Sequence, residues 1–388
     1  MRSIITGQLS MPPERNSAED EHAPRPGRAG THTGRPAARG DLPPGPGIGI
    51  DHMVIGKKRV SVRELCIVEK AFGQLLHFET GLTGQRPPLL LVAPLSGVRA
   101  GILYDMILGL LPRHEVYCLA WKDAADVPLA DGPFGLEDNI TYVVEMIRHL
   151  GAGAHVIGVC QSALPALAAA AILAEDPARP ATLTLVAGKL DTRINPTWVD
   201  LLPRSLPLAW FKICSITTVP ASRRGHGRRV YPGSTGLMML STYLLHHCAG
   251  GGELLDKLLH DDGSDAAGHP FSRLFFSITD VPAEFFLDTI AQVFQRAALA
   301  EGRLAWQGAA VDAGRITQTA LLTIEGGADD ISGPGQTHVA HDLCAGIPAE
   351  RRGRLLCPHA GHIGLFFGAR WRQEILPHVS RFIRENGN

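Results

Sequence analysis

The sequence has no excess of charge of either sign and no regular cysteine spacing. Its 37 Lys and Arg residues balance 38 Asp and Glu residues, for a formal net charge of −1. Because no basic stripe stands out, a nucleic-acid partner is not indicated. The seven cysteines are odd in number and lack close pairs, which argues against a disulfide framework or a zinc site. We therefore expect no metal and no cofactor, in a reducing compartment.

The sequence also lacks the apolar segments that direct a chain to a membrane. Its first residues contain only the pair Ile4 and Ile5, whereas a secretory signal needs an apolar stretch of about 7–15 residues. The longest apolar run, residues 164–174, is shorter than the roughly 18 residues that suggest a membrane span. These absences favour a cytoplasmic protein.

Composition divides the chain into parts. Residues 1–46 hold eight of the 28 prolines and no hydrophobic period, so we expect a disordered tail. The remainder, in a chain that is 45% hydrophobic, is long enough to bury a large core. We expect that core in residues 47–189 and 313–388, and a mostly helical cap in residues 190–312.

Strand-like and helical patterns alternate from residue 59 onward. Apolar runs typical of buried parallel strands are followed by helical spacing: "PPLLLVAPLSG" by "GILYDMILGLLPRH", "EVYCLAWKD" by "LEDNITYVVEMIRHLG", and "AHVIGVC" by "SALPALAAAAILAED". The alternation returns at "TALLTIEGGADD" and "GRLLCPHAGH" and ends in a helix from Trp371. This order predicts an α/β fold with a mostly parallel sheet flanked by helices.

The segment "GVCQS", residues 158–162, joins a predicted strand directly to an Ala-rich helix. The α/β-hydrolases carry their nucleophile at such a junction, in a G-x-S-x-G elbow whose strained backbone exposes the side chain. Here Cys160 replaces the serine and Ser162 replaces the final glycine. A cysteine is often only a buried packing residue, but this position favours a nucleophile.

Candidates for the acid and the base follow in the order that this fold uses, nucleophile, acid, base. Asp329 and Asp330 follow one predicted strand, and His359 and His362 follow the next. An aspartate at a strand end often only caps a turn. Finding all three residue types in order at strand ends nevertheless indicates a Cys–Asp–His triad, with the choice within each pair left open.

Longer motifs resemble one family. They are "LLHFET", "LLVAPLSG", "YVVEMIRHLG", "HVIGVCQ", "DTRINPT", "VYPG", "EGGADDISGPGQT" and "GHIGLFFGARWRQEI". From about Gly49 on, the chain resembles the intracellular polyhydroxybutyrate depolymerases, which are related to the polyhydroxyalkanoate synthases. The resemblance implies an α/β-hydrolase fold, with Cys160 as nucleophile, Asp329 as acid and His362 as base.

The implied reaction is hydrolysis of the ester bonds of intracellular polyhydroxybutyrate or its 3-hydroxyacyl oligomers. The thiolate of Cys160 would form a thioester acyl-enzyme that water then releases. The elbow geometry assigns the oxyanion hole to the backbone N–H groups of Gln161 and Leu95, with Ser96 as the alternative to Leu95.

The expected cap would supply an apolar passage for a polyester chain, lined by candidates that include Phe285, Phe286, Met238 and Met239. Polymer or oligomer is the expected partner, with association at the polymer granule. Two alternatives stay open: an acyltransferase of the synthase type, in which an alcohol captures the thioester, and a catalytically weak granule-binding protein.

Two further features have ordinary explanations. We expect the run "RRGHGRR" that begins at Arg223 to be a solvated loop. We expect Cys118, which lies within a predicted strand, to be a core residue without chemistry.

Overall fold

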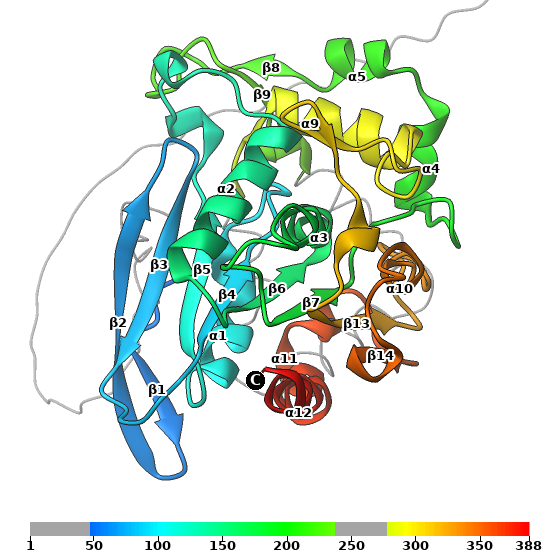
Figure 1. The fold of residues 1–388 in the computed structure, drawn as a ribbon. Coiled ribbons are helices and arrows are strands. Elements are labelled where there is room, and N and C mark those ends of the chain that lie inside the picture. Colours follow the sequence, from blue (N-terminus) through cyan, green and yellow to red (C-terminus); the bar gives the residue numbers. More distant parts are fainter. Residues whose placement is uncertain (1–46, 237–277, 388) are drawn as a thin grey trace, which may run out of the picture. The chain divides into compact units, whose positions relative to one another are not determined.

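The computed structural model describes residues 47–236 and 278–387 (Figure 1). The predicted tail, residues 1–46, and two of the expected channel residues, Met238 and Met239, lie outside these ranges. Within them, no helix is both long enough and apolar enough to cross a membrane.

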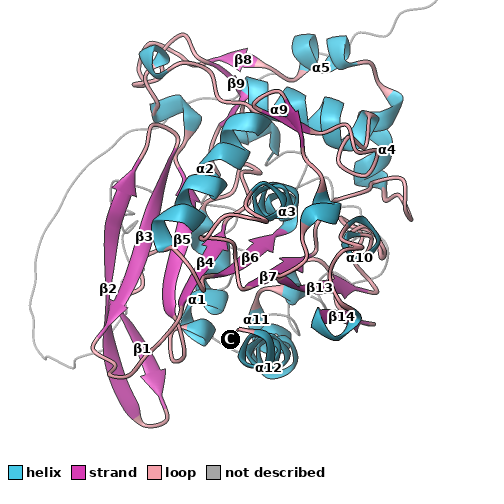
Figure 2. Cartoon of the chain, in the orientation of Figure 1, coloured by secondary structure: helices cyan, strands magenta, loops and turns pink. Residues whose placement is uncertain are grey.

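A mostly parallel sheet forms the centre of the described chain (Figure 2). Its strand order is β1-β2-β3-β5-β4-β6-β7-β13-β14. The first three strands pair in antiparallel fashion, as does β3 with β5, and every later pair is parallel. The strands are β1 (His52–Ile55), β2 (Lys58–Glu69), β3 (Gly73–Thr80), β4 (Pro88–Val92), β5 (Glu115–Trp121), β6 (His155–Val159), β7 (Thr182–Val186), β13 (Ala320–Gly326) and β14 (Arg352–Cys357).

Helices cover both faces of this sheet. The helices α2 (Leu136–Leu150) and α3 (Ala163–Ile172) pack side by side on one face, and α1 (Tyr104–Leu110) and α12 (Leu376–Asn386) lie on the other (Figure 1). The shorter helices α10 (Ala340–Leu343) and α11 (Gly368–Arg370) follow β13 and β14. The predicted α/β fold is therefore confirmed.

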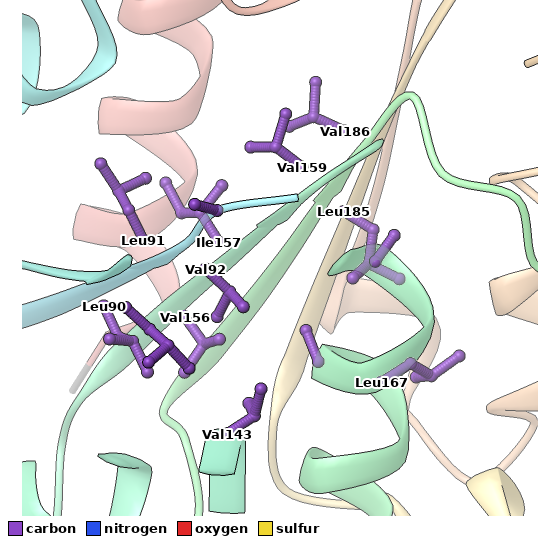
Figure 3. Close-up of a cluster of buried hydrophobic side chains, with 14 of the residues drawn as sticks. Leu90, Leu91, Val92, Val143, Val156, Ile157, Val159, Leu167, Leu185 and Val186 are labelled. Atoms are coloured by element: carbon purple, nitrogen blue, oxygen red, sulfur yellow. The ribbon is translucent and has the colours of Figure 1, made fainter. Parts of the chain in front are cut away.

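The buried strands carry the continuous apolar runs seen in the sequence. In β4, Leu89, Leu90 and Leu91 are completely buried in the hydrophobic core. Figure 3 shows Leu90 beside Val156 and Leu91 beside Ile157 of the neighbouring strand β6. Burial of each such leucine contributes about 1.5–3 kcal/mol. Cys118 of β5 is also completely buried, as predicted.

The chain between β7 and β13, where we expect a mostly helical cap, contains short strands as well as helices. Its described part has helices α4 (Trp198–Ser205), α5 (Leu208–Cys214) and α9 (Ala283–Asp288), the last continuing into a π-helix, Thr289–Gln295. It also has a small sheet, β8 (Thr217–Thr218), β9 (Arg229–Tyr231) and β10 (Val281–Pro282), and a hairpin, β11 (Ala305–Trp306) and β12 (Ala309–Ala310). Buried β-branched residues, Val230 and Val281, suit strands better than helices.

The arginine-rich run is not simply a solvated loop. Arg223 pairs with Asp123 and Asp126, each at 3.0 Å. Arg228 is buried and donates to the carbonyl oxygens of Val127 (3.0 Å) and Gly132 (2.7 Å). Through these hydrogen bonds and ion pairs, the two arginines connect the inserted segment to the loop that follows β5.

Candidate active site

Cys160 lies at a sharp turn between β6 and α3. Its φ of 55° places it in the left-handed region, which costs a non-glycine residue about 1–3 kcal/mol. Gly158, two residues earlier, faces the returning helix so closely that an added Cβ would lie 2.8 Å from the Cβ of Ala166. The turn therefore requires a small residue at 158 and projects Cys160 from the end of its strand.

The glycine that usually ends the elbow is replaced by Ser162, and its hydroxyl explains why a serine fits. The Oγ atom accepts the N–H of Val159 (2.8 Å) and lies 2.6 Å from the carbonyl oxygen of Val92, to which it donates. The side chain is 3% exposed. Ser162 therefore points into the protein and stabilises the turn.

The three predicted side chains lie in one hydrogen-bonded line. The Nε2 atom of His362 is 3.1 Å from the Sγ atom of Cys160, and its Nδ1 atom is 2.8 Å from Oδ2 of Asp329. His362 follows β14 and Asp329 follows β13, so the carboxyl ends of three parallel strands supply them. Their alternatives in the sequence, Asp330 for the acid and His359 for the base, lie outside this line of hydrogen bonds. Asp330 is half-buried and His359 is exposed.

The Asp329 carboxylate is held at both oxygens. While Oδ2 accepts a hydrogen bond from His362, Oδ1 accepts the backbone N–H groups of Ile331 (2.9 Å) and Ser332 (2.8 Å). The side chain of Asp329 is completely buried. Its orientation, and therefore the Nδ1–H tautomer of His362 that can accept a proton at Nε2, is fixed by these bonds.

Burial and the neighbouring charges act in opposite directions on Cys160 and His362. Burial raises the pKa of the Cys160 thiol, but the interaction with His362, aided by the Gln161 N–H and by Lys189, lowers it overall. Burial lowers the pKa of His362, but Asp329 and Cys160 raise it overall. Both directions favour a thiolate–imidazolium pair, the reactive form of a cysteine nucleophile.

A cavity of about 180 Å³ opens beside Cys160. One part of its lining comes from loops and helices of the core, and the other from α9 and the π-helix of the inserted segment. The lining residues are Ser96, Leu136, Cys160, Gln161, Leu164, Pro165, Lys189, Phe285, Thr289, Val293, Phe294 and Ile331. Most are apolar, so the cavity suits an acyl chain.

The structure separates the other predicted site residues. Gln161 follows Cys160 and lines the cavity, whereas Leu95 is buried and its neighbour Ser96 forms part of the lining. Phe285 lines the cavity. Phe286 is not among the described lining residues, and it stacks on Tyr231 with ring centroids 4.2 Å apart.

Sequence reasoning missed Lys189, which lines the cavity and acts on Cys160. The available signal was its place directly after β7, at the sheet edge that also carries Cys160 and Asp329. It also missed Thr289 and Val293, whose π-helical backbone no simple period reveals. In the described residues, no group of three or more His, Cys, Asp or Glu side chains is arranged to hold a metal ion.

Several solved structures are similar to this chain. A monoacylglycerol lipase from Paleococcus ferrophilus is 14% identical, with a TM-score of 0.46 over 78% of this chain and 96% of that one. A putative lipase from Acinetobacter baumannii AYE is 14% identical, with a TM-score of 0.47 over 84% of this chain and 93% of that one. The 2-hydroxy-6-oxo-6-phenylhexa-2,4-dienoate hydrolase from Rhodococcus sp. strain RHA1 is 15% identical, with a TM-score of 0.48 over 84% of this chain and 99% of that one.

No curated protein matches the sequence. The family described as PHB de-polymerase C-terminus matches residues 187–387, which is just over half of the 388-residue chain. The match spans the inserted segment, Asp329 and His362. The chain therefore belongs to the PHB depolymerase family, and it is a hydrolase of the esterase type.

Proposed function

We propose that the protein hydrolyses the ester bonds of polyhydroxybutyrate, or of its 3-hydroxyacyl oligomers, through a thioester on Cys160. The observation that carries the proposal is the line of hydrogen bonds from Asp329 through His362 to Cys160, which ends at an apolar cavity. A binding protein would need the cavity but would have no use for this line.

In the first half of the reaction, Nε2 of His362 takes the thiol proton and the Cys160 thiolate attacks the ester carbonyl carbon. The carbonyl oxygen becomes an oxyanion, which the proposal assigns to the backbone N–H groups of Gln161, in the elbow, and of Leu95, in the loop after β4. The tetrahedral intermediate then loses its alcohol, which receives the proton from His362, and a thioester remains on Sγ.

In the second half, Nε2 of His362 accepts a proton from water, which attacks the thioester carbonyl. The Cys160 thiolate leaves and recovers that proton through His362, so the enzyme is regenerated and the acid is released. Asp329 stabilises the imidazolium in both halves without taking its proton.

The proposal assigns residues 190–312 to a cap over the site. Phe285, Thr289, Val293 and Phe294 from this range line the cavity beside Cys160. Transfer of methyl and methylene groups of the substrate into this space contributes about 25 cal/mol per Å² of apolar area. An extended polyester chain, whose repeat carries one methyl and one methylene group, would therefore bind with its acyl part against this wall.

An exposed apolar surface lies next to this wall and suits an insoluble polymer. We propose that the protein binds polymer granules in the cytoplasm through this surface. Trp198, Leu201, Trp210 and Ile213 on α4 and α5 are 40% to 80% exposed, and α4 packs against the π-helix. Replacing both Trp210 and Ile213 by Ser should weaken binding to amorphous polymer particles several-fold and leave turnover of a soluble ester unchanged. Equal binding by the variant would exclude this surface.

Incubation with amorphous polyhydroxybutyrate and with short 3-hydroxybutyrate oligomers tests the function, with released acid as the readout. Added alcohol separates hydrolysis from acyl transfer, because a transferase would form a new ester in proportion to the alcohol. If the folded protein binds polymer but releases no acid from either substrate, the hydrolytic proposal is wrong.

A further inference from the structure

Two loops that meet beside the site contain the sequence motifs "DTRINPT", residues 191–197, and "DDISGPGQT", residues 329–337. The side chain of Asn195 donates from Nδ2 to the carbonyl oxygen of Pro334 (2.7 Å). An added Cβ at Gly333 would lie 2.0 Å from the carbonyl oxygen of Asn195, so only glycine allows this approach. The start of the inserted segment is thus fixed to the loop that carries Asp329.

The ammonium group of Lys189 lies between these loops. It donates to the carboxylate of Asp200 and to the carbonyl oxygen of Ile331, and Oε1 of Gln336 lies 3.5 Å away. The side chain is 11% exposed. Because an ammonium group has three N–H donors, the protein itself supplies an acceptor for each, and Lys189 is not available to bind a substrate carboxylate.

Asp200 gives Lys189 a fixed anchor. Its side chain is completely buried, and Oδ2 accepts the N–H of Thr197 (2.8 Å) and Nε2–H of Gln336 (2.7 Å). Nε2 of Gln336 also donates to the carbonyl oxygen of Ile194 (3.1 Å). A buried carboxylate with this set of donors has one favourable position, so the ammonium group that it binds is held in place too.

One peptide group connects Lys189 to the acid. The carbonyl of Ile331 accepts from Lys189, and the N–H of the same peptide, which belongs to Ser332, donates to Oδ1 of Asp329 (2.8 Å). Because a peptide group is planar, fixing its carbonyl also fixes the direction of its N–H. The other oxygen of Asp329 binds His362 (2.8 Å).

We propose that Lys189 is a positioning residue which, through the peptide between Ile331 and Ser332, holds the Asp329 carboxylate in the orientation that binds His362. The inference rests on the proposed roles of Asp329 and His362. It also relates the two motifs, since Thr197 of the first motif donates to Asp200, which binds Lys189, and the second motif supplies the peptide that Lys189 holds.

The test compares Lys189→Met, combined with Asp200→Asn, in two backgrounds. The second substitution is included because Lys189→Met alone would leave a buried carboxylate unpaired, which is destabilising. In the wild-type background we expect kcat to fall about 10–100-fold, the range found when groups that orient metal ligands are removed. In an Asp329→Ala background, where no carboxylate is left to position, the further loss should be under about threefold.

A second readout requires no ester. The rate at which iodoacetamide alkylates Cys160, followed across pH on the Cys160 peptide, reports the thiolate even if the substrate proposal is wrong. Because Lys189 also lowers the pKa of Cys160 directly, the pair of substitutions should move this profile to higher pH in both backgrounds, and further in the wild-type background. Equal shifts in both backgrounds would mean that Lys189 acts on Cys160 only directly and not through Asp329, and would overturn the inference.

Two further variants complete the test. Thr197→Val keeps Lys189 but removes a second donor to the Ile331 carbonyl (3.0 Å), so a smaller loss in the same direction is expected. Lys122→Met is the matched control, because Lys122 also donates to a carboxylate, that of Glu69, and to a backbone carbonyl. A loss of kcat in this control as large as that from Lys189 would also contradict the inference.

Discussion

The two walls of the cavity beside Cys160 are built differently. The core wall combines loops after β4, β6, β7 and β13 with the first turns of α2 and α3. Directional hydrogen bonds fix the reacting groups beside it, such as that of His362 to Asp329 at 2.8 Å. The inserted wall is α9 and the π-helix, and its lining side chains are mainly apolar. Phe285 lies against Phe134, with ring centroids 6.5 Å apart. The hydrogen bonds of this wall, such as that from the N–H of Leu136 to Asp288 (3.1 Å), involve residues outside the lining side chains of α9. Changes in the core wall should therefore affect the chemical step, and changes in the inserted wall should affect which acyl chains bind.

The largest effect is expected at the tip of the core wall. Cys160→Ala removes the attacking sulfur, so ester hydrolysis should fall by at least about 10⁴-fold with an unchanged circular dichroism spectrum. Ser162→Ala is the control. Because Ser162 binds only backbone groups, it should reduce stability by about 1–3 kcal/mol and retain activity within about tenfold. Near-normal turnover by the Cys160 variant would exclude this residue as nucleophile.

The second largest loss of activity is expected for substitution of the acid, Asp329. Asp329→Asn disturbs the tautomer and orientation of His362, and a comparable change in another triad costs about 10⁴-fold. Asp330→Asn, a neighbouring and half-buried position, should cost less than about tenfold. Steady-state kinetics on a soluble ester measure both losses. A larger loss for Asp330→Asn than for Asp329→Asn would identify Asp330 as the acid.

The pH dependence of cysteine alkylation should separate Cys160 from Cys66. Interaction with His362 outweighs burial and lowers the pKa of Cys160, so its thiolate persists at pH values where an ordinary thiol, with a pKa of about 8.5, is protonated. Burial and Glu69 raise the pKa of Cys66, so its thiolate forms only at higher pH. Between pH 6 and 7, alkylation should be at least about tenfold faster at Cys160. Similar rates would mean that no ion pair forms.

The smallest effects are expected in the inserted wall. Phe285→Leu enlarges the cavity, so KM for longer oligomers should rise a few-fold while kcat for a small soluble ester stays within about twofold. Phe286→Leu is the matched control, since Phe286 stacks on Tyr231 instead, and the dependence of KM on oligomer length should not change. A common loss of all activity and of the thermal transition would show that Phe285 serves only packing.

The same contrast separates what could be predicted from the sequence. Apolar runs such as residues 89–92 identify buried strands because burial on both faces leaves little freedom of composition. Strand ends then locate Cys160, and the order of residue types locates candidate acids and bases. The choice of Asp329 and His362 from within their pairs came from the family resemblance, because a one-residue difference on a loop leaves no periodic signal.

The inserted segment was less predictable. Its helices are short, its strands have two or three residues each, and part of its wall is a π-helix. Phe285 and Phe286 are adjacent and chemically identical, yet only one lines the cavity. Lys189 was overlooked for a similar reason: its importance comes from contacts with Asp200 and Ile331, which lie on separate segments of the chain.

The thioester itself is the decisive observation. Rapid acid quenching during turnover of an activated 3-hydroxybutyryl ester, followed by peptide mass spectrometry, would locate the acyl group. We expect a 3-hydroxybutyryl adduct on the peptide that contains Cys160, released by neutral hydroxylamine as a thioester should be and absent from Cys160→Ala. An adduct on Ser162 or on any other side chain, or full turnover by Cys160→Ala, would contradict a cysteine mechanism.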